Sequence, residues 1–161
     1  RRSSDLEPYH CRLVEITGGE PLLQPATPEL ISCLVEQHYQ VLLETNGSQQ
    51  IEALPQACVK IVDIKCPSSN AGGSFLMKNL DCLTQNDEIK FVIASRQDYE
   101  FAADMIQNQL PGILPGKIHL SPVWEAIEPR TIAEWIIADN LPARLSLQQH
   151  KIIWPPGQRG V

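Results

Sequence analysis

Apolar and polar residues alternate along most of the short runs that predict strands in this chain. The runs are rich in Val, Ile and Leu, and four of the six are closed by glycine, proline or asparagine, as strands are. The predicted strands span residues 11–17, 40–45, 59–64, 88–94, 117–121 and 144–148. Most of them begin about 30 residues apart, which is typical of repeating strand-helix units and predicts a parallel sheet.

Apolar residues at helical spacing predict three helices between these strands. The first runs to about residue 37, with Thr27 as its N-cap and Pro28 as its first helical residue. The second runs from 96 to about 109. The third begins at Pro129 and is expected to pack one apolar face, made of Ile132, Ala133, Ile136 and Ile137.

The alternation itself predicts how the sheet is covered, because strands buried on both faces read as continuous apolar runs. One parity is apolar: Val14, Ile16, Val62, Ile64, Ile89, Phe91, Ile93, Ile118 and Leu120. The other is polar: Glu15, Thr17, Asp63, Lys65, Glu88, Lys90, Lys117, His119, Ser121, Ser146, Gln148 and His150. We expect helices over the apolar side and an open, incomplete barrel whose polar lumen holds water or a polar ligand. The alternative is a two-layer sheet with one face in solvent.

The first strand ends in a turn that is the strongest candidate for a binding site. Gly18 and Gly19 follow Thr17, and Glu20 and Pro21 come next. Glycines let the backbone approach a ligand, and ligands of parallel sheets bind beyond the carboxyl ends of the strands. A plain glycine turn is the alternative.

Other polar residues also lie at or near strand ends. Asp63 and Lys65 are two residues apart on one strand, so they point to the same face and can form an ion pair, either structural or catalytic. Glu44, Thr45 and Asn46 end the second strand. For His119 we favour a satisfied core histidine, because no nucleophile is near it in sequence.

Composition narrows the class of protein. A chain of 161 residues with 43% hydrophobic residues fits one domain over 1–161. The charge of −6 without a Lys/Arg cluster argues against nucleic acid and membrane partners and favours a small molecule. Five irregularly spaced cysteines without a Cys-x-x-Cys pair argue against a structural zinc site, and we expect a reduced, cytoplasmic location.

Phosphate-loop, dinucleotide-binding and Gly-x-Ser-x-Gly motifs are all missing from the sequence. Instead, V-E-I-T-G-G-E-P-L-L-Q at 14–24 resembles the strand motif of radical S-adenosylmethionine enzymes. Five further motifs, in order, resemble the 7-carboxy-7-deazaguanine synthases: E-T-N-G-S at 44–48, D-I-K-C-P-S-S at 63–69, K-F-V-I at 90–93, L-S-P-V at 120–123 and H-K-I-I-W at 150–154.

The resemblance implies a fold and an activity. The fold is a partial (β/α) barrel with parallel strands and helices outside. The reaction converts 6-carboxy-tetrahydropterin to 7-carboxy-7-deazaguanine with loss of ammonia, on the route to queuosine. In the family, a four-iron, four-sulfur cluster cleaves S-adenosylmethionine reductively and magnesium assists the ring contraction. An electron donor such as flavodoxin and a homodimer are further expectations.

Site residues follow from the same resemblance, position by position. Gly18, Gly19 and Glu20 match the turn that holds the methionine amino group. Thr17 matches a substrate contact, and the terminal carboxylate of Val161 is expected to reach the substrate. Residues matching segments that line the S-adenosylmethionine pocket are Cys66, Pro67, Ser68, Ser121, Pro122, Val123 and Trp124.

One departure separates the chain from the family pattern. The family's three cluster cysteines and a magnesium-binding residue precede the glycine motif, and the five cysteines present are too dispersed to replace them. We therefore expect the first strand and cluster loop to be missing and the chain alone to be inert. A different radical S-adenosylmethionine enzyme, such as a glycyl-radical activase, and a non-enzymatic barrel module are the alternatives.

Overall fold

The computed structural model describes residues 10–110 and 112–154, and it contains a parallel sheet of six strands within these ranges. The strands lie side by side in chain order, and each pairs in parallel with the next. They are β1 (Leu13–Ile16), β2 (Gln40–Thr45), β3 (Val59–Asp63), β4 (Glu88–Ile93), β5 (Ile118–Pro122) and β6 (Arg144–Leu145). The predicted parallel α/β architecture is confirmed.

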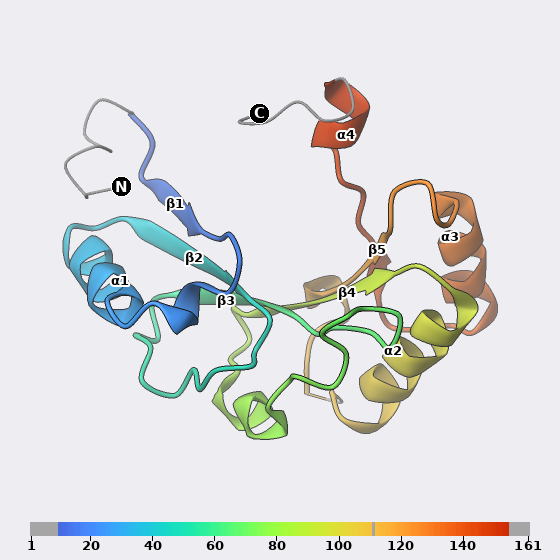
Figure 1. The fold of residues 1–161 in the computed structure, drawn as a ribbon, viewed down its shortest axis with the longest axis horizontal. Helices are drawn as coiled ribbons and strands as arrows, with labels where there is room; N and C mark the ends of the chain where they lie inside the picture. The colour runs from blue at the N-terminus through green and yellow to red at the C-terminus, as the bar shows by residue number, and fades with distance from the viewer. Residues whose placement is uncertain (1–9, 111, 155–161) are drawn as a thin grey trace.

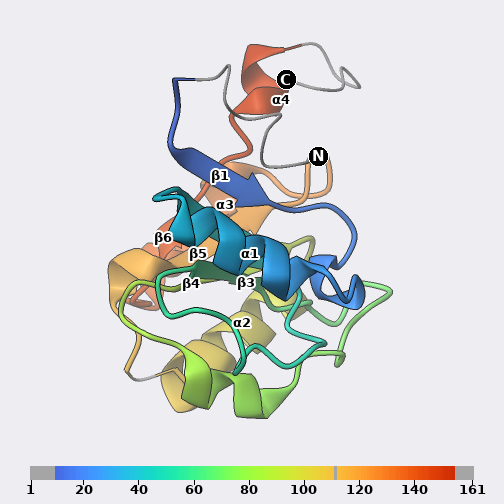
Figure 2. The same cartoon turned by 90° about the vertical axis from the view of Figure 1, so that its left-hand side faces the viewer.

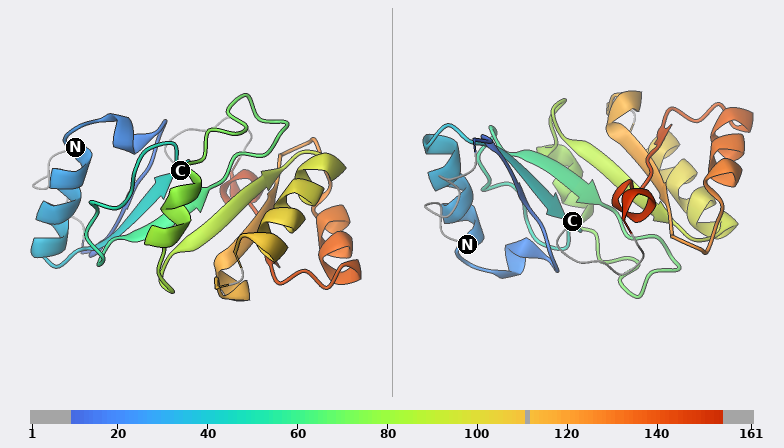
Figure 3. Two further views of the ribbon diagram at one scale, coloured as in Figure 1. Left: turned by 90° about the horizontal axis from the view of Figure 1, so that it is seen from below. Right: turned by 90° about the horizontal axis from the view of Figure 1, so that it is seen from above.

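Three helices cover one side of the curved sheet (Figures 1 and 3). They are α1 (Thr27–Glu36), α2 (Arg96–Asn108) and α3 (Pro129–Ala138). Three short 3-10 segments lie in the connections: η2 (Pro21–Leu23) before α1, η3 (Met77–Cys82) between β3 and β4, and η4 (Pro115–Lys117) before β5. The one-turn helix α4 (His150–Ile153) lies on the opposite side, and Figure 2 shows it above the strands while α2 lies below them. Within the described residues, none of the helices combines the length and apolar character that a membrane span requires.

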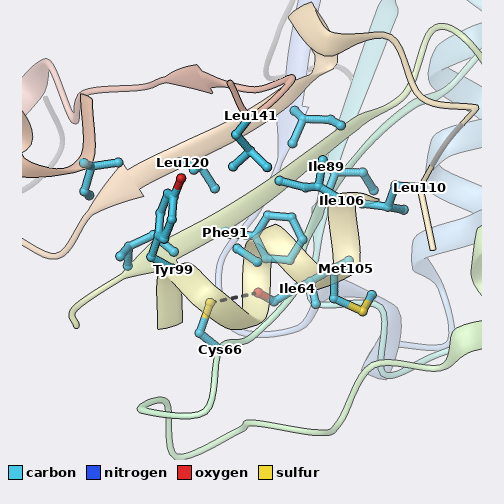
Figure 4. Packing of buried hydrophobic residues seen from close by; sticks show 14 of the residues in the cluster. Ile64, Cys66, Ile89, Phe91, Tyr99, Met105, Ile106, Leu110, Leu120 and Leu141 are labelled. Atoms are coloured by element: carbon cyan, nitrogen blue, oxygen red, sulfur yellow. Dashed lines mark hydrogen bonds between the residues drawn. The ribbon is translucent and has the colours of Figure 1, made fainter. Parts of the chain in front are cut away.

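The apolar parity of the strands forms the core, as the alternation predicts. Phe91, Tyr99 and Met105 pack between the centre of the sheet and α2 (Figure 4). A second cluster, built on Ile31, Leu34 and Leu43, fills the space between α1 and β2. Apolar burial is the main favourable term in folding, so the helices are held on this side of the sheet and the polar parity is left on the other.

Some details of the elements differ from the sequence prediction. Thr27 is the first residue of α1 and not its N-cap, which is Ala26, and the Thr27 hydroxyl donates to the Pro21 carbonyl at 2.7 Å. Ile137 is 78% exposed, and Trp135 packs against the core in its place. The connections from β2 to β3 and from β3 to β4 hold no α-helix, so the strand-helix repeat is incomplete.

A buried ion pair interrupts the apolar side of β3. Lys60 lies on the same parity as Val62, and its ammonium is 3.2 Å from Asp87 Oδ1. Their side chains are 4% and 1% exposed. Asp87 also accepts hydrogen bonds from the Lys60 and Thr84 amides, at 2.7 Å each, and from the Thr84 hydroxyl. These bonds satisfy the buried carboxylate. The hydrophobic pattern of the sequence alone does not reveal this ion pair.

Candidate functional site

The carboxyl ends of β1, β2 and β3 enclose a polar pocket of about 200 Å³. Gly18 and Gly19, which follow β1, have φ angles of +99° and +55°, a conformation that side chains with a Cβ rarely adopt. The predicted glycine turn therefore lies where ligands of parallel sheets bind. The lining residues are Thr17, Gly18, Gly19, Glu44, Thr45, Asn46, Asp63 and Lys65.

Glu20 joins the glycine turn to the end of β2. Its Oε1 accepts from the Leu22 amide at 3.1 Å and from the Thr45 hydroxyl at 2.8 Å. Its Oε2 accepts from the Asn46 amide at 2.7 Å. Three of about four acceptor positions on the carboxylate are thus occupied internally. Glu20 therefore fixes the glycine turn against the end of β2, and one acceptor position remains for a ligand.

A second pocket, of about 310 Å³, adjoins the first. Asp63 and Lys65 line both pockets, and their side chains form the predicted ion pair at 2.6 Å. Asp63 Oδ1 is buried and has no hydrogen-bond partner within the described ranges. The remaining lining residues of this second pocket are Cys66, Ser68, Ser69, Val92, Ala94 and Val123.

Glu44 connects the first pocket to the centre of the polar face. Its Oε2 accepts from the Thr17 hydroxyl at 2.9 Å, and its Oε1 pairs with the Lys90 ammonium at 2.7 Å. Burial alone would raise the pKa of the Glu44 carboxyl, but Lys90, Thr17 and Lys65 outweigh burial and hold it below its ordinary value. Glu44 is therefore an ionised group at neutral pH.

Asp98, on the first turn of α2, organises the second pocket. It is fully buried and accepts from the Ser68 hydroxyl at 2.6 Å, the Ser68 amide at 3.0 Å and the Ala94 amide at 2.9 Å. Burial favours the neutral acid, but the hydrogen bonds from Ser68, Ala94 and Ser95 dominate and lower the pKa of the Asp98 carboxyl. Sequence reasoning missed Asp98. The available signal is Ser95, an N-cap whose hydroxyl accepts from the Asp98 amide.

The other predicted cofactor-binding residues lie at different depths. Ser121, at 2% exposure, and Pro122 are buried at the end of β5. Pro67 is exposed beside the second pocket. Trp124 is 41% exposed, and the Lys151 ammonium lies 6.0 Å from its ring centroid. Val161 lies outside the described residues.

His119 has the structural role favoured by sequence reasoning. It is 7% exposed, its Nε2 lies 2.9 Å from Glu88 Oε2, and Arg144 Nε donates to its Nδ1 at 3.2 Å. Burial and the Arg144 charge lower the pKa of His119, against the opposing effect of Glu88. Its side chain lines neither of the two pockets, and neither does that of Lys90, whereas Asp63 and Lys65 line both.

The described residues do not present a metal site. Across 10–110 and 112–154, no group of three or more His, Cys, Asp and Glu side chains is placed to hold a metal ion. Cys66 lines the second pocket, but burial and the nearby Asp98 and Asp63 charges raise the pKa of its thiol to about 12. A thiol with this pKa is a poor source of the thiolate that iron-sulfur clusters need.

Comparisons with known proteins identify relatives of this chain. The chain is 44% identical to the 7-carboxy-7-deazaguanine synthase of Koribacter versatilis, over 92% of the chain and 72% of that protein. It is 43% identical to the enzyme of the same name from Chlorobaculum tepidum, over 95% of the chain and 70% of that protein. No protein-family model matches.

A solved structure supports the fold. The crystal structure of QueE from Escherichia coli superposes with a TM-score of 0.65 at 24% identity, covering 89% of this chain. The chain spans 60% of the length of that structure.

Proposed function

This chain belongs to the family of 7-carboxy-7-deazaguanine synthases, and we propose that it forms the ligand-binding part of such an enzyme. The activity would be conversion of 6-carboxy-tetrahydropterin to 7-carboxy-7-deazaguanine with release of ammonia, in queuosine biosynthesis. The observation that carries the proposal is 44% identity over nearly the whole chain to a relative of that name. The first pocket is polar and suits a polar substrate, whereas the adjoining second pocket has both polar and apolar lining residues and suits a cofactor that carries both kinds of group.

The second pocket and its neighbourhood fit S-adenosylmethionine. The Asp63 carboxylate, which lines both pockets, and the remaining acceptor position of Glu20 can accept from a ligand ammonium or hydroxyl group. When bound, this cofactor supplies the radical that takes a hydrogen atom from the substrate. We propose that the residues holding it are Gly18, Gly19, Glu20, Cys66, Pro67, Ser68, Ser121, Pro122, Val123 and Trp124.

The chain's own residues do the positioning around the substrate. Thr17 donates its hydroxyl proton to Glu44, so its oxygen faces a substrate as an acceptor. Lys90 keeps Glu44 ionised, and Lys65 supplies a partly exposed ammonium between the pockets. These groups suit the amide-like and amino groups of a pterin, and the Val161 carboxylate is proposed to complete the substrate contacts.

The iron-sulfur cluster and magnesium do not fit the described residues. Cluster ligands must converge as thiolates, whereas Cys58 and Cys66 are buried with pKa values raised to about 11 and about 12. An electron donor such as flavodoxin, a homodimeric state and a cytoplasmic location stay predictions.

The test is product analysis of the protein expressed from its complete reading frame. Reconstituted without oxygen and given S-adenosylmethionine, a reductant and 6-carboxy-tetrahydropterin, it is expected to form 7-carboxy-7-deazaguanine and 5′-deoxyadenosine, both measured by mass spectrometry. Deoxyadenosine without the deazaguanine would favour a different radical enzyme, such as a glycyl-radical activase. Neither product would favour a binding module.

A further inference from the structure

The hydroxyl of Ser68 points its proton away from the second pocket. Its Oγ lies 2.6 Å from Asp98 Oδ2, while the Ser68 amide donates to the other carboxylate oxygen at 3.0 Å. A carboxylate ion only accepts hydrogen bonds, so the hydroxyl must be the donor in this contact. A hydroxyl has one proton, and that proton is committed to Asp98.

Asp98 is held in the state that this arrangement needs. It is 0% exposed, and the Ala94 amide also donates to its Oδ2 at 2.9 Å. The hydrogen bonds lower the pKa of its carboxyl despite burial, so Asp98 is ionised at neutral pH and cannot reverse the bond by donating a proton itself. The backbone contacts fix the carboxylate against α2, so it cannot turn away from Ser68.

Ser68, in contrast, is accessible to a ligand. It is exposed and lines the second pocket, and the two lone pairs of its oxygen remain available there. We propose that Asp98 is a positioning residue that makes Ser68 an obligate hydrogen-bond acceptor, so that this part of the pocket selects a ligand group carrying an O–H or N–H donor. The part of this inference that concerns recognition rests on the proposed function.

The direction of the bond can be measured without any ligand. In the chain labelled with ¹³C at aspartate carboxyl carbons, Ser68→Ala is expected to raise the pKa of Asp98 toward its ordinary value of 3.8, because a donor to the ionised form is lost. Ser69→Ala is the matched control, since Ser69 lines the same pocket but its hydroxyl accepts from the Ala71 amide. An Asp98 pKa that is the same in Ser68→Ala and wild type would overturn the proposal.

Recognition is tested by combining Asp98→Ala with ligand analogues. Alanine removes the carboxylate that accepts the Ser68 hydroxyl proton, which frees that proton to point into the pocket. The probes are S-adenosylhomocysteine and analogues that each lack one donor: 2′-fluoro, 3′-fluoro, N6,N6-dimethyl and deaminated forms. Binding is measured by calorimetry on the protein expressed from its complete reading frame.

The analogue that lacks the donor facing Ser68 is expected to bind wild type about tenfold more weakly than S-adenosylhomocysteine, the parent compound. The reason is that the Ser68 lone pairs then have no donor to accept from. The same analogue should lose less than about threefold in affinity for Asp98→Ala, and the other analogues should show the same affinity ratio to the parent in both proteins. If every analogue shows the same affinity ratio to the parent compound in wild type and in the variant, the proposal that Ser68 selects a donor group is overturned. Failure of wild type to bind S-adenosylhomocysteine would contradict the proposed function instead, and the carboxyl titration would still decide the direction of the bond.

Discussion

The Lys90 ammonium donates to Glu44 Oε1 at 2.7 Å and thereby joins β4 to β2 across the polar face of β3. Both side chains are 26% exposed, so the pair is neither fully solvated nor deeply buried. Lys90→Met is expected to lower the free energy of unfolding by about 1 to 3 kcal/mol, because Glu44 is left partly buried without its cation. Urea denaturation measures this change.

Two further variants separate the ion pair from general disruption. Adding Glu44→Gln to Lys90→Met should restore part of the lost stability, since the uncompensated charge is removed. Arg130→Met is the matched control, because the Arg130–Glu134 pair on α3 is 87% and 59% exposed and should change stability by less than about 0.5 kcal/mol. A double variant less stable than Lys90→Met would contradict this account.

The lowered pKa of Glu44 predicts a pH dependence in the acid range. Burial opposes the shift, but Lys90 and Thr17 dominate it, so the folded pKa lies below the ordinary value of 4.5. The stabilisation from Glu44 is therefore complete above pH 4.5 and is lost as pH falls through the folded pKa. The difference in unfolding free energy between wild type and Glu44→Gln should shrink from pH 7 to pH 3. A constant difference across that range would show that Glu44 is not perturbed.

Sequence reasoning found the sheet and the glycine turn because both depend on local patterns. Strand alternation placed Val62 under the helices and Asp63 on the polar face, as observed. Sequence reasoning did not identify Asp98 as a site residue, because its partner Ser68 lies 30 residues away and no local pattern marks that contact. Lys60 was missed for a related reason, since its counterion Asp87 lies in another segment.

The buried Lys60–Asp87 pair predicts two unequal losses of stability. Asp87→Ala leaves a lysine that is 4% exposed without its counterion and also removes the acceptor for the Lys60 and Thr84 amides. We expect a loss of about 3 to 5 kcal/mol in unfolding free energy. Lys60→Met should cost less, because Asp87 keeps its amide and hydroxyl donors. Thermal and urea unfolding measure the stability of both variants. A larger loss for Lys60→Met than for Asp87→Ala would contradict this prediction.

Glu20→Ala is expected to weaken S-adenosylmethionine binding in the complete protein, through two effects. It removes a charged acceptor, which is worth roughly 1.5 to 3 kcal/mol, and it also frees the Thr45 hydroxyl and the Asn46 amide. Thr45→Val is the control, because it removes the two structural hydrogen bonds of the Thr45 hydroxyl, to Glu20 and from the Gly47 amide, and leaves the carboxylate. Calorimetry that finds equal weakening in both variants would reduce Glu20 to a structural role.

The cysteines differ in environment enough to predict the order in which they react. Cys11 is exposed, whereas Cys58 and Cys66 are 0% and 2% exposed. Burial raises the pKa of these two thiols to about 11 and about 12, with Asp87 adding to the shift at Cys58 and Asp98 and Asp63 at Cys66. At pH 8 their thiolate fractions are on the order of one in a thousand and one in ten thousand.

A short pulse of iodoacetamide at pH 8, followed by peptide mapping, should therefore label Cys11 first and Cys58 and Cys66 last. The partly exposed Cys33 and Cys82 should fall between them. Unfolding in guanidinium before the pulse is the control, since it should make all five react alike. Cys66 borders the second pocket, so its result has a further consequence. If Cys66 reacts as fast as Cys11 in the folded chain, its thiol is open to the pocket and supplies the thiolate that a cluster ligand needs.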